Sequence, residues 1–552
     1  MRQRWGLIAL VAVISFFTGG WLLQRGTARD GNVYQRARLF DDVLSHVAAY
    51  YVDSIPQADL YEKATNGLLE ELKDPYSVLL QGEDYKALTE TTTGNYGGLG
   101  IQIDVRDGWI TVVAPLPETP AEQAGVETGD QIISVDAKST QGWSSDEAVK
   151  ALRGPAGSTV ELRIRRAGMA QPITYKLKRA QIHVRSVPPG NLFPGGIGYI
   201  SLSPVAESST MELRREITAL LGKGMKSLVL DLRGNPGGLL DQGVKVADLF
   251  LNQDQEIVET RGRARGATKT FVDMAGQEWP NLPIVVLVND GTASAAEIIS
   301  GALQDHDRAV VVGTPTFGKG LVQTLFPFSD NSALKLTTGR WYTPSGRTIQ
   351  RTARTEEEQV AQAARQAGVP VPTGDAMADS SIHADTANRP VYKTDSGRIV
   401  RGGGGIVPDL IVRQDSLTDS ERAFATALGS KFAEYRDAIT ATALQLKNDK
   451  GVTSEDFTVT PAMRAEVLRR LRAKGVTLTD ETFAKAQSLI DDQLGYEVAR
   501  YIFGRPAEFR RRARDDKQMQ TALGLLRKAD TPTALLSLAM AQAASAGTER
   551  RN

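Results

Sequence analysis

The sequence predicts a multidomain protein with an α/β core between helical regions. The chain has 552 residues, which at about 150 residues per domain corresponds to three or four domains. Between residues 195 and 340, short apolar runs typical of strands alternate with helical stretches, as in layered α/β proteins. Residues 33–90 and 415–552 instead show the three- and four-residue apolar spacing of helices.

Composition excludes several classes of function. The 65 Lys and Arg balance 65 Asp and Glu, so a general nucleic-acid binder is not expected. The absence of cysteine rules out disulfides, iron–sulfur clusters, Cys-ligated zinc and a cysteine nucleophile. The four histidines are too scattered to predict a metal site or a Ser/His arrangement.

Residues 1–28 are predicted to form a membrane anchor or a signal peptide. Arg2 and Arg4 precede an uncharged run over 5–23, whose 19 residues come close to the roughly 20 that span a bilayer. The alternative is a cleaved secretory signal, for which residues 26–28 would serve as the cleavage site. We expect an uncleaved transmembrane helix in the cytoplasmic membrane, with the bulk of the exported chain on the periplasmic or extracytoplasmic side.

The next predicted regions are a helical segment over 33–90 and a small β domain over 91–180. In the helical segment, apolar residues at helical spacing indicate a packed helix pair; they include Leu39, Phe40, Val43, Leu44, Val47 and Tyr50. From residue 91 the chain changes to short strands punctuated by glycine, with alternating runs at 101–105, 109–113 and 131–135.

The order of these strands and glycines resembles a PDZ domain. In that family a glycine-rich loop offers backbone N–H groups to the terminal carboxylate of a peptide, which then adds as a strand beside the one that follows. The resemblance implies a groove lined by a helix at about 145–152. It implies carboxylate binding by Gly98, Leu99, Gly100 and Ile101. The alternative is a small β module whose glycines only make turns.

The predicted core, residues 181–414, carries three loops placed where strands end. The loop at 233–238 (Arg-Gly-Asn-Pro-Gly-Gly) follows a strand and opens a helix, so its N–H groups suit an oxyanion or a phosphate, or make only a tight turn. In the loop at 289–297, Ser294 and Glu297 have the spacing of a capping box, which is compatible with a nucleophile at the helix start.

The third loop, at 313–320, nearly matches a nucleotide-binding motif. Gly320 replaces the required Ser or Thr, however, and a strand-like pattern follows instead of a helix. Lys319 is therefore a candidate general base, because packing near buried strands would lower the pKa of a lysine from about 10.4 toward neutrality. A solvated loop lysine is the alternative.

Taken together, the glycine loop, Ser294, Lys319 and Gln323 resemble the C-terminal processing peptidases, or tail-specific proteases. The match covers most of residues 36–350 and resumes at 402–409. The resemblance implies a core like that of crotonase and Clp protease, with an inserted PDZ domain. It also implies a serine endopeptidase with a Ser–Lys dyad that needs no cofactor.

Carried over to this sequence, the family pattern assigns a role to each matching residue. Ser294 would be the nucleophile, Lys319 the general base and Gln323 the residue that orients it. The oxyanion hole would consist of the N–H groups of Gly238 and Ala295. Supporting positions would be Gly237, Glu297 and Asp305.

The expected function is cleavage of exported, partly unfolded proteins near their C-termini, with the PDZ domain recognising the tail and gating the site. The partners would be proteins or peptides with free C-termini; a homo-oligomer or an activating partner is left open. The alternative is a catalytically silent PDZ adaptor that binds protein C-termini. No chemistry is assigned to the polar insert at 352–390 or to the helical region at 415–552.

Overall fold

The computed structural model describes residues 33–166, 168–329, 331–351, 389–414 and 417–549. Contacts divide the chain into two compact units: the smaller holds residues up to 82 together with 323–337, and the larger holds 83–322 and the chain from 338 on. The predicted anchor at 1–28 and all but the last two residues of the predicted insert at 352–390 lie outside the described residues.

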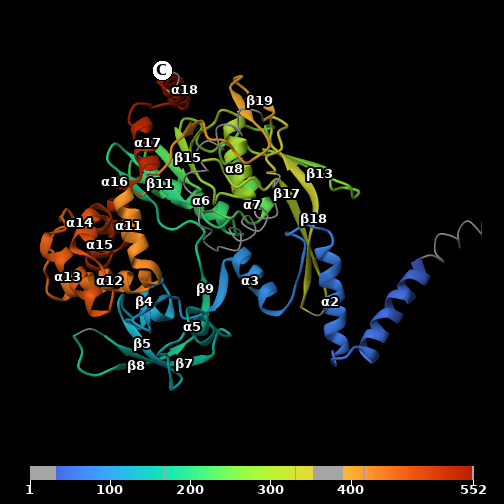
Figure 1. The fold of residues 1–552 in the computed structure, drawn as a ribbon. Helices are drawn as coiled ribbons and strands as arrows, with labels where there is room; N and C mark the ends of the chain where they lie inside the picture. The colour runs from blue at the N-terminus through green and yellow to red at the C-terminus, as the bar shows by residue number, and fades with distance from the viewer. Residues whose placement is uncertain (1–32, 167, 330, 352–388, 415–416, 550–552) are drawn as a thin grey trace, which may run out of the picture. The chain divides into compact units, whose positions relative to one another are not determined.

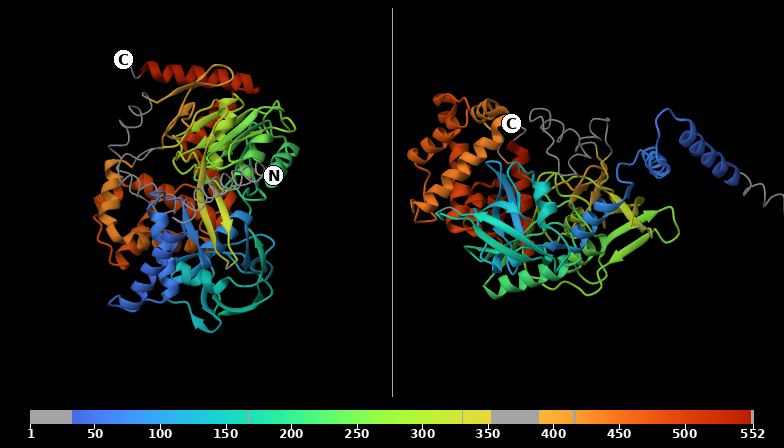
Figure 2. Two further views of the ribbon diagram at one scale, coloured as in Figure 1. Left: turned by 90° about the vertical axis from the view of Figure 1, so that its right-hand side faces the viewer. Right: turned by 90° about the horizontal axis from the view of Figure 1, so that it is seen from below.

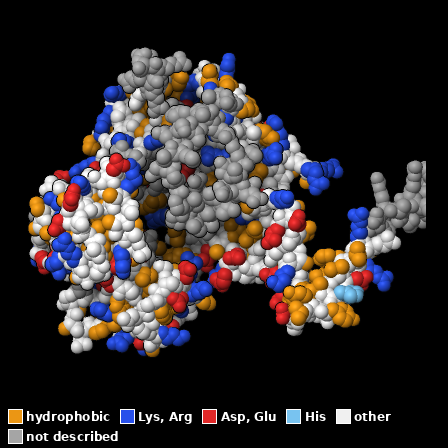
Figure 3. Space-filling model, viewed as in Figure 1, with side chains coloured by type: hydrophobic (Ala, Val, Ile, Leu, Met, Phe, Trp, Pro, Cys, Tyr) orange, Lys and Arg blue, Asp and Glu red, His pale blue; other side chains and the backbone are white. Residues whose placement is uncertain are grey.

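The smaller unit contains a helix over 33–50, α2 (Gln57–Glu70) and the short strand β1 (Val78–Leu80). β1 pairs antiparallel with the first residues of β18 (Ala333–Tyr342), which also pairs with β17 (Leu321–Pro327). The apolar stripe predicted to pack this segment is largely exposed within the unit: Leu39 is 64% exposed and Phe40 is 53% exposed. Figure 3 shows apolar side chains gathered on these helices.

In the larger unit, residues 95–183 form a small β domain (Figure 1). Its sheet has the antiparallel order β3-β4-β5-β7-β8, with β6 beside β5, and a separate pair joins β2 to β9. The helix α5 is opened by a capping box at Ser144 and Glu147. The strands and helices are α3 (Gly82–Thr93), β2 (Asn95–Gly98), β3 (Ile101–Arg106), β4 (Trp109–Pro115), α4 (Pro120–Gln123), β5 (Gln131–Val135), β6 (Lys138–Ser139), α5 (Ser145–Leu152), β7 (Thr159–Arg165), β8 (Ile173–Lys178) and β9 (Ala180–His183).

The core of the larger unit is a six-stranded sheet in the order β10-β11-β12-β15-β16-β21, parallel except for β10. Its strands are β10 (Asn191–Phe193), β11 (Ile197–Ser201), β12 (Ser227–Asp231), β15 (Ile284–Val288), β16 (Val310–Gly313) and β21 (Leu410–Ile411). β15 is buried at every residue, as expected for a strand that is covered on both faces of the sheet. Ile284 and Val286 enter one apolar cluster and Val285 enters another, as the two-residue period of a strand requires.

Helices cover both faces of this sheet (Figures 1 and 2). On one face, α6 (Ser209–Gly222), α7 (Leu240–Asp248) and α8 (Ala295–Asp305) supply the apolar side chains of the larger cluster. On the other face the cover comes from α17 (Lys517–Leu526) and α18 (Pro532–Glu549), near the end of the chain. The last two helices therefore belong to the core, a relation that the sequence did not indicate.

The other helices of the C-terminal region form a bundle, in which residues between 424 and 503 build a separate apolar cluster, whereas Ala513 joins the cluster of the core sheet. An apolar stripe of this region is buried in the separate cluster at Ile490, Leu494 and Val498, so it serves as core. The helices are α11 (Asp419–Leu428), the 3-10 turn η1 (Gly429–Lys431), α12 (Phe432–Asn448), α13 (Pro461–Ala473), α14 (Asp480–Lys485), α15 (Gln487–Phe503) and α16 (Arg505–Asp515). Two hairpins complete the larger unit: β13 (Glu256–Gly262) with β14 (Lys269–Val272), and β19 (Val391–Lys393) with β20 (Ile399–Arg401).

One sequence prediction is corrected. We predicted anchoring in the cytoplasmic membrane through a transmembrane helix, but none of the helices in the described part of the chain has the length and apolar character to span a bilayer. The predicted anchoring is therefore not retained.

Candidate functional site

Three loops predicted from the sequence meet at one edge of the core sheet. They follow β12, β15 and β16, which are adjacent and parallel, so their carboxyl ends lie together. Backbone hydrogen bonds join the loops in pairs. The Ala293 N–H donates to the Asn235 carbonyl (2.9 Å), and the Phe317 N–H donates to the Thr292 carbonyl (3.0 Å). The three loops thus form one structure, as expected for a site assembled from separate parts of the chain.

Ser294 occupies a strained position at the start of α8. Its φ of 52° and ψ of −118° lie in a region that non-glycine residues rarely adopt, and such residues concentrate at functional sites. The side chain is half-buried, at the positive end of a buried eleven-residue helix. The strain turns the serine out of the helical path while its carbonyl still accepts the N–H groups of Glu297 and Ile298 (2.8 and 3.0 Å).

The glycine loop at 233–238 lies directly against this serine. A Cβ added at Gly237 would come within 2.8 Å of the Ser294 Cβ and 2.9 Å of the Ala295 nitrogen, so only glycine fits there. The side chain of Asn235 holds the loop, because its oxygen accepts the Gly237 N–H (2.8 Å) and its nitrogen donates to the Leu202 carbonyl (2.7 Å). Gly237 and Ala295, assigned near the oxyanion hole by the sequence, are therefore neighbours.

Glu297 joins the serine loop to the lysine loop. Its carboxyl group is fully buried and accepts four hydrogen bonds, from the Ser294 N–H (2.8 Å), the Thr316 hydroxyl (2.5 Å), the Gly318 N–H (2.7 Å) and the Lys319 N–H (2.9 Å). Burial raises the pKa of Glu297, and the four donors act in the opposite direction. Each oxygen of the carboxyl group receives two donors, so this one side chain joins the serine loop to the lysine loop through four hydrogen bonds.

Lys319 is half-buried in a loop held on both sides. Its N–H donates to Glu297, and its carbonyl accepts the indole N–H of Trp341 (3.0 Å). The neighbouring Gly318 has a φ of 88°, and an added Cβ there would lie 2.9 Å from the Gly405 nitrogen. The backbone that carries the lysine is thereby fixed relative to the start of α8.

Two further predicted site residues have contacts of their own. Gln323 belongs to the smaller unit, where its amide donates to the Tyr76 carbonyl (3.0 Å). Asp305 is eleven residues beyond Ser294 on α8, about 16 Å away at the helical rise. There it is buried and accepts hydrogen bonds from Arg347 (2.6 Å) and the Thr343 hydroxyl (2.5 Å). Any influence of Asp305 on the site would act through α8.

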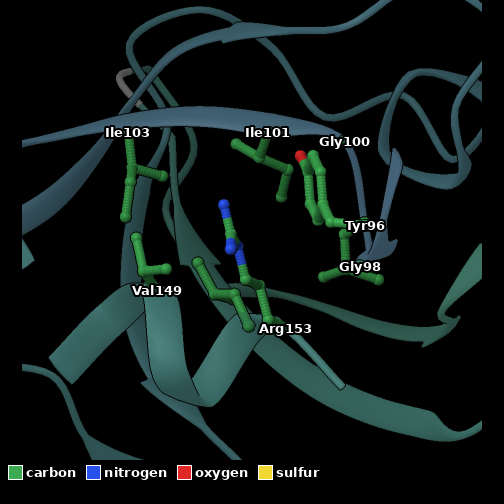
Figure 4. A pocket seen from close by; sticks show the side chains of 9 residues that line it. Tyr96, Gly98, Gly100, Ile101, Ile103, Val149 and Arg153 are labelled. Carbon is green, nitrogen blue, oxygen red and sulfur yellow. The ribbon is translucent and has the colours of Figure 1, made fainter. Parts of the chain in front are cut away.

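The predicted peptide groove of the β domain lies between β3 and α5 (Figure 4). Its rim contains the loop residues Gly98, Leu99 and Gly100, and apolar side chains project into it from both elements. The groove is lined by Tyr96, Gly98, Leu99, Gly100, Ile101, Ile103, Val149, Leu152 and Arg153. Gly100 has a φ of 75°, and an added Cβ would lie 2.4 Å from Thr119, so the loop requires glycine at this position.

A cation in this groove was missed by sequence reasoning. The Arg153 guanidinium lies 4.4 Å from the centre of the Tyr96 ring and pairs with Glu90 of α3. Burial raises the pKa of Tyr96, which keeps its hydroxyl neutral. Arg153 directly follows a predicted helix, but no local pattern reveals that its side chain turns back into the groove.

The described residues contain no group of three or more histidine, aspartate or glutamate side chains placed to hold a metal ion. The arrangement instead offers a serine at a helix start, a lysine on a neighbouring loop and a glycine loop against the serine. Together with the groove domain, this is the arrangement expected of a serine-type α/β peptidase that carries a PDZ domain.

Comparison with known proteins identifies the family. Residues 196–360 match peptidase family S41, and residues 111–166 match the PDZ domain. The carboxy-terminal-processing protease of Bartonella bacilliformis is 41% identical over 354 residues, which cover 62% of this chain and 81% of the relative. The carboxy-terminal processing protease CtpA of Bacillus subtilis is 38% identical over 299 residues, covering 54% of this chain and 63% of the relative.

Among solved structures, the photosystem II D1 C-terminal processing protease is 31% identical, with a TM-score of 0.33, covering 56% of this chain and 89% of that one. The sequence relatives and the family match show that the chain belongs to peptidase family S41, the carboxy-terminal-processing proteases. It is a serine-type C-terminal processing peptidase, as predicted.

Proposed function

We propose that the protein cleaves partly unfolded proteins near their C-termini with Ser294 as nucleophile and Lys319 as general base. The observation that carries this proposal is the buried Glu297 side chain, which accepts the backbone N–H groups of both residues. A single buried side chain thus fixes the start of the nucleophile's helix relative to the lysine loop. Pre-organisation of this kind is what a two-residue catalytic unit requires.

In the proposed reaction, the neutral Lys319 amine takes the hydroxyl proton of Ser294 as the oxygen attacks the scissile carbonyl. The negative charge that develops on the carbonyl oxygen would be stabilised by the N–H groups of Gly238 and Ala295. Lys319 then returns its proton to the leaving amine as the peptide bond breaks. Water hydrolyses the acyl-enzyme ester by the reverse sequence, with Lys319 again as the base. Gln323 would orient the lysine.

The PDZ domain would capture the substrate's tail and control access to the site. Three features support this role: the loop at Gly98–Ile101, the apolar groove and the Arg153 guanidinium at its edge. Backbone N–H groups and a cation both suit a terminal carboxylate, and the open edge of β3 suits an added strand.

The dyad is tested by steady-state cleavage of an unfolded protein with Lys319→Ala, and with Lys223→Ala as a matched control at an exposed helix end. Lys319→Ala should abolish turnover, the control should keep the wild-type rate, and circular dichroism should show both folded. A near-normal rate for Lys319→Ala would refute the assignment of the base.

Tail capture is tested with substrates that carry a free or an amidated C-terminus. The free acid should be cleaved several-fold faster, and substitution of Arg153 by Gln should reduce that preference. Equal cleavage of acid and amide by the wild type would remove the PDZ domain from this role. The alternative function, a silent adaptor, predicts binding of free tails without any turnover.

A further inference from the structure

Strand β3, along which a bound tail would pair, is an edge strand of its sheet. β3 and β4 are joined by the two-residue turn Asp107–Gly108, with φ values of 50° and 72°. In such a hairpin the flanking pair, Arg106 and Trp109, exchanges hydrogen bonds. The preceding residue, Val105, therefore directs its carbonyl away from β4, as do Ile103 and Ile101 at two-residue intervals. These three positions form the open edge.

The last of these carbonyls is already occupied. Arg436 of α12 donates from its Nη2 atom to the Val105 carbonyl (2.9 Å), and its Nη1 atom lies 3.6 Å from the Asp104 carboxylate. Arg436 comes from the C-terminal helical bundle, which is more than 300 residues away in sequence. The bundle thus reaches the strand that the tail would use.

Further polar contacts hold the bundle against the β3–β4 hairpin. Lys474 pairs with Asp107 and with Asp437 (3.2 Å), and the Asp107 N–H donates to Asp437 (3.2 Å). Partial burial alone would lower the pKa of Lys474, but the two carboxylates raise it, so the contact keeps its charge at neutral pH.

A second ion-pair group lies beside the first. Arg106 is 7% exposed and lies between Asp104 (3.2 Å) and Glu497 of α15 (3.7 Å). Charges of opposite sign therefore meet at the turn end of the hairpin, and Arg436 is one of several contacts between the hairpin and the bundle.

We infer that Arg436 ends the tail groove, so that only about the last four residues of a substrate can pair with β3. This inference rests on the proposed tail capture. A tail with its carboxylate at Gly98–Ile101 runs antiparallel to β3, and its last residue and its third from the end would face Ile101 and Ile103. The fifth residue from the end would need the Val105 carbonyl, which Arg436 holds.

The inference is tested by calorimetric titration of the full chain carrying Ser294→Ala, which prevents cleavage. The probes are free-acid peptides of four and eight residues that share the last four, leucyl-alanyl-valyl-alanine. Both should bind with the same Kd within about twofold. With Arg436→Ala added, the eight-residue peptide should bind about fivefold tighter, the value of one added backbone hydrogen bond, and the four-residue peptide should be unchanged.

The control substitution is Arg422→Ala, at an exposed arginine on α11 of the same bundle, which should leave both Kd values unchanged. Thermal unfolding checks that each variant is folded. A fivefold preference for the longer peptide in the parent protein, or no gain with Arg436→Ala, would overturn the inference. Equal binding of the four-residue acid and its amide would instead overturn the proposed tail capture itself.

Discussion

Replacing Gly237 by alanine should disable the peptidase, whereas the same change at Gly234 in the same loop should be tolerated. Both glycines have positive φ values, 88° and 65°, so the backbone strain of an alanine, about 1–2 kcal/mol, is similar at the two positions. They differ in the room available for an added Cβ. The new Cβ at Gly237 would lie 2.7 Å from the Ala293 carbonyl oxygen and 2.8 Å from the Ser294 Cβ, whereas none of the described atoms beyond the chain neighbours lies within 4 Å at Gly234.

The size of the effect follows from these distances. Ordinary contact begins at 3.4 Å, so the glycine loop and the serine must separate by more than half an ångström. Overpacking of this kind costs about 1–3 kcal/mol of stability. A displacement approaching 1 Å at a reacting centre costs roughly 10²-fold in rate. Relative to Gly234→Ala, the Gly237→Ala variant should therefore lose about 100-fold in kcat/KM.

The assay is cleavage of an unfolded protein by both variants, with urea denaturation as the measure of folding. The two variants should differ by about 100-fold in kcat/KM, and the stability loss of about 1–3 kcal/mol should leave Gly237→Ala folded in the absence of urea. If Gly237→Ala kept kcat/KM within threefold of Gly234→Ala, the close approach of the two loops would not matter for catalysis, and the proposed position of the oxyanion hole would be wrong.

Three further substitutions test how the site and its surroundings are held. Glu297→Gln places an amide NH2 group against backbone N–H donors, so the contact between the two loops should lose about 2–5 kcal/mol of stability. In peptide cleavage, kcat should therefore fall at least 100-fold. A rate within threefold of wild type would contradict the bridging role of Glu297. Asp305→Asn removes the carboxylate that pairs with the buried Arg347, so urea denaturation should show a free energy of unfolding lower by about 3–5 kcal/mol. A decrease below about 1 kcal/mol would refute the stabilising role of this ion pair. Partial burial alone would raise the pKa of Asp307, but hydrogen bonds from Ser396 and the Arg398 pair outweigh it and lower that pKa. The resulting stability is present above the ordinary pKa near 4 and is lost as pH falls through the lower folded value, so an Asp307→Asn deficit of about 1–3 kcal/mol at pH 7 should be smaller at pH 3 and should continue to shrink at lower pH. Equal deficits at pH 7 and pH 3 would exclude this ionisation as the cause.

Much of the site could be predicted because the patterns that indicate it lie within short stretches of sequence. The apolar run at 284–288 indicates a doubly buried strand, and the loops that follow such strands lie at one edge of a parallel sheet. Ser294 and Glu297 have the spacing of a capping box, and the glutamate does accept the Ser294 N–H as that motif requires.

Other features depend on contacts between distant residues, which local patterns do not contain. The capping-box spacing gives no sign that Glu297 also binds the Lys319 N–H, because that contact depends on how two loops pack. A doubly buried strand such as β15 requires cover on both faces, but the sequence does not indicate that α17 and α18 supply it from more than 200 residues away. The direction of the Arg153 side chain likewise depends on distant contacts, those with Glu90 and Tyr96.

Peptide-bond cleavage that depends on Ser294 is the central claim, and intact-mass analysis tests it most directly. An unfolded protein of known mass is incubated with the full chain and, in parallel, with its Ser294→Ala variant. The account predicts new masses with the wild type alone, corresponding to cuts near the C-terminus of the substrate. Equal cleavage by both proteins, or cuts spread without relation to the tail, would contradict it.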